Sequence, residues 1–421
     1  MDSLSPRHSG LKWLFLDLNS YFASVEQQDN PHLRGRPVAV VPMETDYTCA
    51  IAASVEAKMY GVKTGTMIHD AKRLCPPLQC VLARHDAYVR YHHKVVDEVA
   101  RHTPINKIWS VDELSSRLPP NKRNREAATA LAGRIREGIW KNVGAQINCS
   151  IGIAPNSFLA KVATDMMKPN GLVILDPDHL PGPLLDLDLL DLPGINSRML
   201  QRLYNSAVKT VEDLWNISPK QARRIWGSVS GERFWYNLHG YDIPDLETSR
   251  STIGHSRILD PGLRSPAAAR QVARRLTIKA ASRLRREEFF ATRFYFTARI
   301  VDGPRWDMAA QIAPAQDNFT FLAALDTLWA QMMDECRPRQ IKKLAVGFYH
   351  LKKEHEISLD LFSKPTPQSQ RNAALSAAID AINKKHGAET LHLGVSPKTQ
   401  AGFVGTKIAF SRVPELAEFM E

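Results

Sequence analysis

The sequence predicts a protein built from several domains, mostly of the α+β class. Its 421 residues exceed what one ordinary core supports, and a hydrophobic content of 44% is enough to fold more than one domain. Strand-like and helix-like patterns mix up to about residue 175 without a strict βαβ rhythm, which favours an antiparallel or mixed sheet. A helical stretch follows over 184–241, and residues 255–350 combine two long helices with β-rich sequence.

The first 175 residues alternate irregularly between short apolar runs and amphipathic stretches. A buried strand is predicted over 13–17, where the apolar run from Trp13 ends in Asp17. Residues 50–61 predict a strand that enters a helix, and Gly61 stops this helix. The other predicted strands cover 37–42, 105–114 and 147–153, and the other predicted helices cover 20–28, 124–142 and 156–167.

Proline-rich breaks divide the rest of the chain. Prolines precede the helical stretch, a second break spans 244–254, and a polar linker follows residue 352. Between these breaks we expect a basic helix over 266–288, a strand over 292–300, and helices over 319–335 and 371–385. The predicted domain boundaries are therefore 1–175, 176–245, 251–352 and 353–421.

The charge balance favours a nucleic acid as partner. Lys and Arg number 55 against 44 Asp and Glu, which gives a net charge of +11 and a pI near 9.4. A basic protein without such a partner is the alternative. The five cysteines are irregularly spaced, which disfavours zinc sites and disulfides and indicates thiols in a reducing cytoplasm. No apolar run is long enough to span a bilayer, so no membrane association is expected.

Three carboxylates are candidates for metal chemistry. Asp17 ends the first apolar strand, and Asp112 and Glu113 stand together in another strand-like run. An acid at the tip of a buried strand costs desolvation energy unless a cation or hydrogen bonds compensate it. Mg²⁺ prefers oxygen ligands, and two such ions about 4 Å apart can activate a 3′-hydroxyl and hold the leaving pyrophosphate. The alternative is that these residues are ordinary surface acids at strand ends.

Four motifs in a fixed order carry a family resemblance. They cover Asp17–Glu26, Ala53–Val62, Ser110–Glu113, and Ser150–Asn156 with Leu159–Gly171. Together they resemble the Y family, the translesion DNA polymerases. The resemblance implies catalysis by Asp17, Asp112 and Glu113, and a metal site that these three form with the backbone carbonyl of Leu18. It also implies two Mg²⁺ ions as cofactors, with primer-template DNA and deoxynucleoside triphosphates as binding partners.

The resemblance further implies the fold of a right-hand polymerase. Residues 1–175 would form an α+β palm, with small fingers at about 28–80. Residues 176–245 would form an all-helical thumb that contains a helix-hairpin-helix. Residues 251–352 would form an α+β little finger, and 353–421 a C-terminal extension.

Four residues are expected at the incoming nucleotide, namely Tyr21, Phe22, Lys58 and Lys168. The two lysines match positions at which the family contacts the triphosphate. Phe22 matches the aromatic steric gate, whose ring leaves no room for a 2′-hydroxyl and so excludes ribonucleotides. The alternatives are a core aromatic and two solvated surface lysines.

Several positions depart from the family pattern. Asn19, Val55 and Lys58 replace an aspartate, a tyrosine and an arginine, and lysine lacks the bidentate fork with which arginine binds phosphate. Asn19 and Lys58 resemble one branch, the UmuC type, which is the catalytic subunit of DNA polymerase V. Other regions resemble polymerase IV. The UmuC type implies a UmuD-type subunit and a recombinase filament as partners. Leu114 with Ser115 departs from both branches, which leaves the catalytic rate open.

A turn in the helical stretch is the first segment expected to bind DNA. Leu192–Asn196 resembles a helix-hairpin-helix turn, in which Gly194, Ile195 and Asn196 would direct backbone amides at a phosphate. Asn196 stands where a glycine is usual, and asparagine tolerates left-handed backbone geometry. An ordinary helical corner is the alternative.

The basic helix over 266–288 is the second segment expected to bind DNA. Arg274 and Arg286, together with Arg275 and Arg285, fall opposite its apolar face, and Lys279 lies at the edge of this arc. Such a stripe suits the phosphate backbone without reading its sequence. A merely solvated face is the alternative.

A short segment near the C-terminal extension resembles the peptide that docks in the sliding clamp. In Ser358–Phe362, the side chains of Leu359, Leu361 and Phe362 would fill an apolar pocket of the clamp. Ser358 stands where glutamine is usual, which weakens the expected contact. An edge strand of the preceding domain is the alternative.

The resemblance as a whole implies a template-directed, low-fidelity translesion polymerase that acts in DNA repair and the SOS response. Two alternatives belong to other classes. A catalytically impaired relative would serve as an adaptor that binds DNA and the clamp. A nuclease or nucleotide cyclase would use the same two-metal chemistry but would leave the thumb and little finger without a use.

Overall fold

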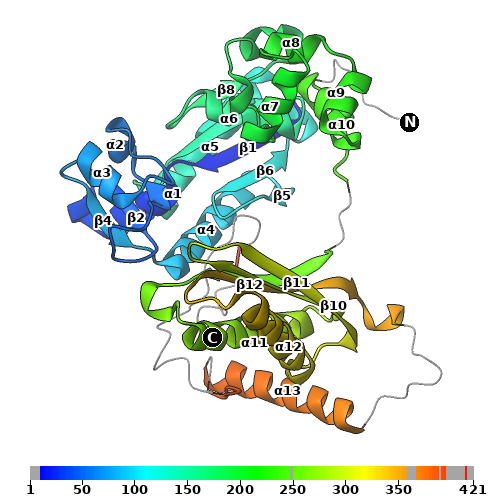
Figure 1. Ribbon diagram of the computed structural model, residues 1–421. Helices are drawn as coiled ribbons and strands as arrows, with labels where there is room; N and C mark the ends of the chain where they lie inside the picture. The colour runs from blue at the N-terminus through cyan, green and yellow to red at the C-terminus, as the bar shows by residue number, and fades with distance from the viewer. Residues whose placement is uncertain (1–9, 247–249, 358–366, 388–389, 395–412, 415–421) are drawn as a thin grey trace. The chain divides into compact units, whose positions relative to one another are not determined.

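The computed structural model describes residues 10–246, 250–357, 367–387, 390–394 and 413–414. The main division falls after Asp245 and separates two compact units, which are described one at a time (Figure 1). Both units combine β-sheets with packed helices, so the predicted α+β multidomain class is confirmed. The finer division into four segments stays a prediction.

The central strand of the first unit is the apolar run that contains Asp17. This strand, β1 (Trp13–Leu18), is buried from Leu14 onward and pairs antiparallel with a strand on each side. Because strand residues alternate between faces, Leu14 packs into one helical layer and Phe15 into the other. The sheet has the order β5-β6-β1-β7-β8. Its other strands are β5 (Lys107–Ile108), β6 (Glu113–Arg117), β7 (Cys149–Ala154) and β8 (Leu172–Ile174).

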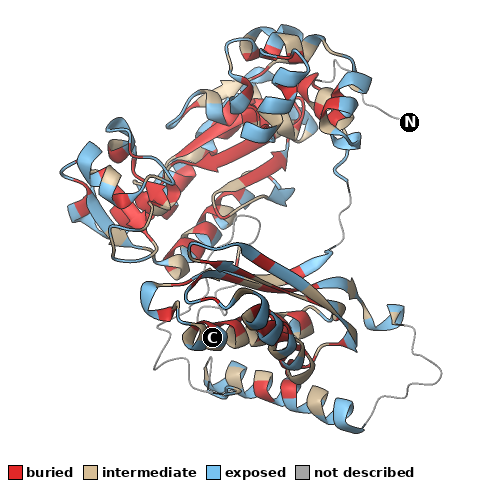
Figure 2. Ribbon diagram, in the orientation of Figure 1, coloured by how far each residue is buried: buried red, intermediate tan, exposed pale blue. Residues whose placement is uncertain are grey.

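Helices cover both faces of this sheet. α4 (His85–Ala100) and α5 (Arg125–Gly138) pack on the Leu14 side. α6 (Ser157–Met166) packs on the opposite side. α1 (Tyr21–Asp29) follows β1 almost directly. Figure 2 shows the sheet and the inner sides of these helices as the buried part of this unit, so the end of β1 lies between two helical layers.

The run 105–114 is a hairpin rather than the single predicted strand. β5 ends at Ile108 and β6 begins at Glu113. The backbone amides of Trp109 and Ser110 both donate to the carbonyl oxygen of Glu113, which closes the turn. This turn contains Asp112, so the acidic pair straddles the end of a strand.

The sequence pattern did not predict helix α4. Its buried face follows the helical period but includes the polar residues His92 and Glu98 beside Tyr88 and several valines, so apolar residues alone do not mark the whole face. Both polar side chains are satisfied inside the fold. His92 Nδ1 lies 2.8 Å from the carbonyl oxygen of Val111, and Glu98 accepts a hydrogen bond from Asn142.

A smaller sheet forms between α1 and α4 along the chain. It has the order β3-β2-β4, with β2 (Val38–Val41), β3 (Ala52–Ala53) and β4 (Gln79–Leu82). Two short helices, α2 (Val55–Met59) and α3 (Ile68–Leu74), share a core with it. Gly61 follows α2 at φ +85°, a conformation that residues with a side chain rarely adopt, so the predicted helix stop is confirmed.

Residues 184–241 are helical, as predicted. The α-helices are α7 (Ser197–Asn205), α8 (Val211–Asn216), α9 (Pro219–Trp226) and α10 (Val229–Leu238). Asn196 does not adopt the left-handed geometry expected for the turn. Its φ is −103°, and its side chain accepts hydrogen bonds from the amides of Arg198 and Met199 as the cap of α7.

The second unit is an antiparallel sheet with helices on one face. The sheet has the order β11-β10-β12-β9. Its strands are β9 (Thr252–Ile258), β10 (Phe290–Ile300), β11 (Arg305–Ala315) and β12 (Ile341–Lys352). α11 (Pro266–Arg286) and α12 (Asn318–Cys336) pack on this sheet, and α13 (Pro367–His386) packs on these two helices (Figure 1). Alternate residues of β10 and β12 therefore point to the other face of the sheet.

Cysteines, helix length and the clamp segment bear on the remaining sequence predictions. The five cysteines carry free thiols. Within the described parts of the chain, no helix combines the length and the apolar character that a membrane crossing requires. The predicted clamp-binding residues Leu359, Leu361 and Phe362 lie outside the described residues.

Candidate active site

Asp17 and Glu113 face each other across two central strands. In the antiparallel ladder between β1 and β6, Asp17 pairs directly with Glu113. Asp17 is only 6% exposed. Like charges directly opposite each other in a sheet are destabilising, so this register requires a cation nearby.

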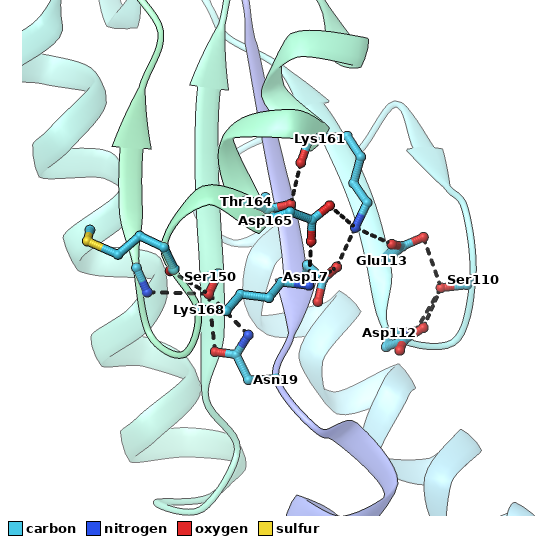
Figure 3. A network of polar contacts seen from close by, with 12 residues as sticks. Asp17, Asn19, Ser110, Asp112, Glu113, Ser150, Lys161, Thr164, Asp165 and Lys168 are labelled. Atoms are coloured by element: carbon cyan, nitrogen blue, oxygen red, sulfur yellow. Dashed lines mark hydrogen bonds and ion pairs between the residues drawn. The ribbon is translucent and has the colours of Figure 1, made fainter. Parts of the chain in front are cut away.

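Two lysines supply that positive charge. Lys161 Nζ lies 2.6 Å from Asp17 Oδ2 and 2.6 Å from Glu113 Oε1 (Figure 3). Lys168 Nζ lies 2.9 Å from the same oxygen of Asp17. Asp165 forms ion pairs with both lysines. Asp17 and Glu113, which are far apart in the sequence, thus share one ammonium group. Lys161 lies within a motif of the family resemblance but was not predicted as a site residue.

Asp112 lies beside this ion-pair cluster, in the turn between β5 and β6. Its carboxylate accepts a 2.5 Å hydrogen bond from Ser110 Oγ (Figure 3). Its backbone carbonyl accepts a hydrogen bond from the amide of Leu18 at 2.9 Å, which ties the turn to the end of β1. The backbone thus holds Asp112 next to Asp17, while its side chain is directed to Ser110.

Burial and neighbouring charges shift the pKa values of these carboxyls in different directions. Burial would raise the pKa of Asp17, but the charges of Lys161 and Lys168 hold it below its ordinary value. Burial, with the charge of Asp17 as a smaller cause, raises the pKa of Asp112. Burial likewise raises the pKa of Glu113, against the effect of Lys161. Negative charge on these two carboxyls is therefore costly until a cation compensates it.

The donor set suits a hard divalent cation by charge and by atom type. The three carboxylates offer oxygen ligands, which Mg²⁺ prefers, and the ammonium group of Lys161 marks a position where positive charge is stabilised. Among the described residues, no three His, Cys, Asp or Glu side chains already have the spacing of a metal site. The side-chain contacts explain this, because Ser110 holds Asp112 while Lys161 holds the other two carboxylates.

Asn19, a departure from the family pattern, has a structural role. Its Nδ2 donates to Ser150 Oγ at 3.1 Å, and its Oδ1 accepts from the backbone amide of Asn170 at 2.8 Å. An aspartate could accept but could not donate in this way. The asparagine therefore ties the end of β1 to the segment that carries Lys168.

The predicted nucleotide contacts divide into two groups. Burial and the charge of Lys168 lower the pKa of Lys58, with Asp17 opposing, so the two lysines lie near one another and near Asp17. Paired cations beside carboxylates suit a metal-bound triphosphate. Tyr21 is only 3% exposed, and its hydroxyl donates to the carbonyl of Tyr88 at 2.7 Å, so its side chain is directed into the fold; its contact with a nucleotide stays a prediction.

The Phe22 ring is partly exposed and rests on aromatic neighbours. It stacks on Tyr88 with ring centroids 4.2 Å apart and planes 10° from parallel. Neither Tyr88 nor the helix that carries it was predicted from the sequence. This ring therefore has one supported face and remains accessible in part.

The predicted DNA-binding turn has fewer free amides than expected. Gly194 has φ +94°, as a tight turn requires, but the amide of Ile195 donates to the carbonyl of Leu192. The segment before this turn is a short 3₁₀ turn, Leu189–Asp191, rather than an α-helix. Phosphate binding by Gly194, Ile195 and Asn196 stays a prediction.

Part of the arginine stripe on the basic helix α11 is paired with acids of neighbouring helices. Arg274 binds both oxygens of Asp326 on α12 at 3.0 and 2.9 Å. The Arg285 side chain is only 9% exposed and binds Asp380 on α13 at 2.6 and 2.9 Å. Lys279 and Arg286 also have interaction partners. The charges of Arg274 and Arg285 are thus paired with acids on two neighbouring helices, which interrupts the expected cationic stripe. DNA binding by Arg274, Lys279 and Arg286 stays a prediction.

Exposed basic residues lie instead on the open face of the four-stranded sheet. Arg299 of β10 pairs with Arg305 of β11 on one side and with Lys343 of β12 on the other. All three side chains are exposed. Arg293, six residues before Arg299 on β10 and therefore on the same face, is exposed as well. We call these four residues the basic sheet face. Adjacent like charges of this kind suit an anionic partner.

Two segments of the chain match known protein families. Residues 16–165 match the impB/mucB/samB family, and residues 250–361 match the C-terminal domain of that family. The DNA polymerase IV of Moorella thermoacetica is 29% identical over 400 residues, which cover 91% of this chain and 95% of that protein. The DNA polymerase IV of Salmonella paratyphi A is 31% identical over 250 residues, which cover 59% of this chain and 70% of that protein.

Solved structures agree with this relationship. A Y-family DNA polymerase chimera of Dbh and Dpo4 matches 82% of this chain and 100% of its own, with a TM-score of 0.69 and 22% identity. The insertion ternary complex of Dbh DNA polymerase matches the same shares with a TM-score of 0.54 and 22% identity. The chain belongs to the Y family of DNA polymerases. These two structures, at such identity, establish the fold alone.

This Y-family member is a DNA-directed DNA polymerase. The relatives named above are polymerases IV, which supports the polymerase IV features of the sequence and gives no support to the UmuC type. The adaptor, nuclease and cyclase alternatives are set aside by the family and by its three retained carboxylates. Polymerases of this family depend on divalent metal ions.

Proposed function

We propose that this Y-family polymerase performs low-fidelity translesion synthesis on primer-template DNA with deoxynucleoside triphosphates and two Mg²⁺ ions. Its setting would be DNA repair and the SOS response in the cytoplasm. The observation that carries the proposal is the direct pairing of Asp17 with Glu113 across two strands, with Lys161 between them. Buried like charges that must share a cation suit a site where metal-bound phosphates react.

The residues of this site divide the work of nucleotidyl transfer. Asp17, Asp112 and Glu113 would hold the two Mg²⁺ ions, with the carbonyl of Leu18 as a further ligand. Bound Mg²⁺ supplies a Lewis acid that activates the primer 3′-hydroxyl and neutralises the phosphates. Lys168 and Lys58 would bind the triphosphate oxygens. Phe22 would lie below the sugar, and a contact of Tyr21 with the nucleotide stays a prediction.

A small fingers segment supports the tolerance of damaged templates. Helix α2 has five residues, and its sheet contains short strands. Val55 and Lys58 stand where the family commonly has larger or fork-shaped groups, so fewer side chains press on the nucleotide. An open site of this kind would accept distorted bases and would also select correct bases less strictly.

Sugar selection would depend on Phe22. Its partly exposed ring is supported from one side by Tyr88, which leaves the other side to meet the sugar. A ribonucleotide would be refused by the clash of its 2′-hydroxyl with this ring. Phe22→Ala should therefore admit ribonucleotides, and an unchanged preference for deoxynucleotides would refute the gate.

The basic sheet face is the surface we propose for duplex DNA in the second unit. Its four exposed basic residues on neighbouring strands suit phosphates, and only an exposed pair of Arg305 with Asp307 at 3.5 Å is recorded for them among the described residues. Arg274 and Arg285 of α11 are instead engaged by acids of neighbouring helices. The turn around Gly194 would add a phosphate contact in the thumb. Contacts with a sliding clamp, a UmuD-type subunit or a recombinase filament stay predictions from the sequence alone.

Primer extension tests this proposal. Purified protein should extend a primer past an abasic site in the template when Mg²⁺ is present, and chelation should stop the reaction. Asp112→Asn in the same assay should abolish extension while DNA binding remains. Extension that persists in the Asp112→Asn protein would overturn the catalytic assignment, and failure at the abasic site alone would overturn the translesion role.

A further inference from the structure

The ring of Phe22 stacks on a tyrosine that is buried and held in place. Phe22 on α1 and Tyr88 on α4 stack at 4.2 Å, and the two helices pack against each other (Figure 1). Tyr88 is fully buried. His85, which precedes Tyr88 by three residues on α4, meets the edge of the Phe22 ring at 6.1 Å. Movement of the Phe22 ring toward α4 would therefore require Tyr88 to move first.

Tyr88 is itself fixed by hydrogen bonds at both ends. Its hydroxyl donates to Glu26 Oε1 at 2.8 Å and accepts from the backbone amide of Arg84 at 3.1 Å. Its backbone carbonyl accepts from the hydroxyl of Tyr21 at 2.7 Å. The position of the ring thus depends on where Glu26 holds the phenolic oxygen.

Glu26 is in turn held by a bidentate arginine. Arg84 Nε lies 3.1 and 3.0 Å from the two carboxylate oxygens, and Arg84 Nη2 lies 2.7 Å from one of them. Nη2 also donates to Asp29 at 2.9 Å. The Glu26 side chain is 6% exposed and that of Arg84 is 42% exposed, so the arginine reaches in from the surface. A fork of this kind fixes orientation as well as distance.

The ion pair and the gate lie on the same face of one helix. Glu26 follows Phe22 by four residues on α1, so the two side chains are neighbours along that face. Phe22 stacks on the ring of Tyr88, and Glu26 accepts a hydrogen bond from the hydroxyl of Tyr88. Phe22, Tyr88, Glu26 and Arg84 therefore form one continuous chain of contacts from the ring that faces the nucleotide site to the surface.

A steric gate excludes ribonucleotides only if the neighbours of its ring keep the ring in place. An aromatic stack alone is a weak restraint, because a ring can slide or tilt at small cost. The hydrogen bonds at its hydroxyl restrain the ring of Tyr88, so the ring of Phe22 that stacks on it also keeps its position. Sugar selection should then depend on residues that never touch the nucleotide.

We propose that Glu26 and Arg84 are positioning residues for sugar selection, which act through Tyr88 on Phe22. This inference rests on the proposed role of Phe22 as the steric gate. The ion pair holds Tyr88 in place, and Tyr88 holds the Phe22 ring where it clashes with a 2′-hydroxyl. Weakening the pair should relax the choice between deoxyribose and ribose more than it slows the use of deoxynucleotides.

Single-nucleotide insertion by the full-length protein tests this chain of contacts. The quantity measured is the ratio of kcat/KM for a deoxynucleotide to kcat/KM for the matching ribonucleotide. Glu26→Gln keeps the shape of the side chain and removes the ion pair, while Tyr88→Phe keeps the ring and removes the tether. Each should lower the ratio on the order of tenfold, the discrimination that one small group carries in a fitted site. Asp86→Asn, which breaks the exposed pair with Arg90 on the same helix, should leave the ratio unchanged.

The same variants in a Phe22→Ala background decide whether the effect passes through the gate. There Glu26→Gln and Tyr88→Phe should cause no further fall in the ratio. An unchanged ratio with Phe22 present, or an equal fall in both backgrounds, would overturn the inference while leaving the gate intact. A normal ratio in Phe22→Ala alone would remove the gate and this inference with it. Should Glu26→Gln not fold, Tyr88→Phe carries the test, because it leaves the ion pair in place.

Discussion

Replacing Lys161 with methionine should destabilise the polymerase only while its carboxylates lack a divalent ion. The ammonium group of Lys161 lies 2.6 Å from Asp17 and 2.6 Å from Glu113, which face each other across the ladder. Methionine keeps the length of the side chain and removes its charge. The two carboxylates would then repel each other with less compensation, until a metal ion supplies the missing charge.

The contacts bound the size of this effect. Removing one partner of a buried ion pair typically costs about 3–5 kcal/mol. The loss here should be smaller, because Lys168 remains 2.9 Å from Asp17 and the Glu113 side chain is 26% exposed to screening solvent. We expect a loss of about 2 kcal/mol without metal. For a unit of this size that corresponds to a fall in Tm of about 4–8 °C.

Thermal denaturation with chelator and with saturating Mg²⁺ measures both states. The difference in Tm between the wild type and Lys161→Met should fall to a small fraction of its value in chelator when Mg²⁺ is present. Mg²⁺ should therefore raise the Tm of the variant more than that of the wild type. Lys141→Met is the matched control. It removes a lysine whose pair with Glu137 is exposed and includes none of the three carboxylates, and its Tm should follow the wild type in both conditions.

An equal Tm deficit with and without Mg²⁺ would refute the reasoning. It would mean that the ion does not bind the carboxylates that Lys161 holds, and the metal assignment would have to move elsewhere. No deficit in chelator would refute the other half, because Asp17 and Glu113 would then not need the ammonium group.

Three further predictions address catalysis, the second unit and pH. Asp112→Asn should lower the rate of nucleotide insertion by at least about 100-fold with DNA affinity retained, and insertion near the wild-type rate would exclude Asp112 as a metal ligand. Arg285→Met should lower the free energy of unfolding by about 3 kcal/mol and leave DNA affinity unchanged. Arg299→Ala should weaken DNA binding and reduce the salt dependence of the binding constant by about one in slope. The reverse pattern in binding titrations would place the DNA contact on α11. Glu98 is buried, and although burial alone would raise its pKa, hydrogen bonds from His102 and Asn142 hold the pKa below the ordinary 4.5. Stability from Glu98 is thus present above about pH 4.5 and lost as the pH falls below it, so the gap in Tm between wild type and Glu98→Gln should close in acid, and a gap independent of pH would contradict this.

The acidic strand tip could be predicted from the sequence because its signal is local. The run Trp13–Leu16 is apolar, and Asp17 interrupts it at a buried position. What the local pattern could not supply is the register. The pairing of Asp17 with Glu113 depends on a ladder between segments almost a hundred residues apart, and only the family resemblance brought these acids together beforehand.

The basic helix shows where charge patterning fails. Its arginines do lie away from the apolar face of α11, as the helical period predicts. The period could not reveal that Asp326 and Asp380, on two later helices, would pack against that face and neutralise Arg274 and Arg285. A charged stripe in a sequence therefore predicts a polar surface but does not tell whether solvent, DNA or another helix covers it.

The two ion pairs near the site differ in a way that matches their proposed roles. Lys161 contacts its carboxylates through a single ammonium group, a point charge that a metal ion can replace. Arg84 holds Glu26 through a planar fork with several hydrogen bonds, which no spherical ion reproduces. An exchangeable cation suits carboxylates that must bind and release metal in each cycle. A fixed bidentate contact suits a Phe22 gate whose ring must keep the same position through every catalytic cycle.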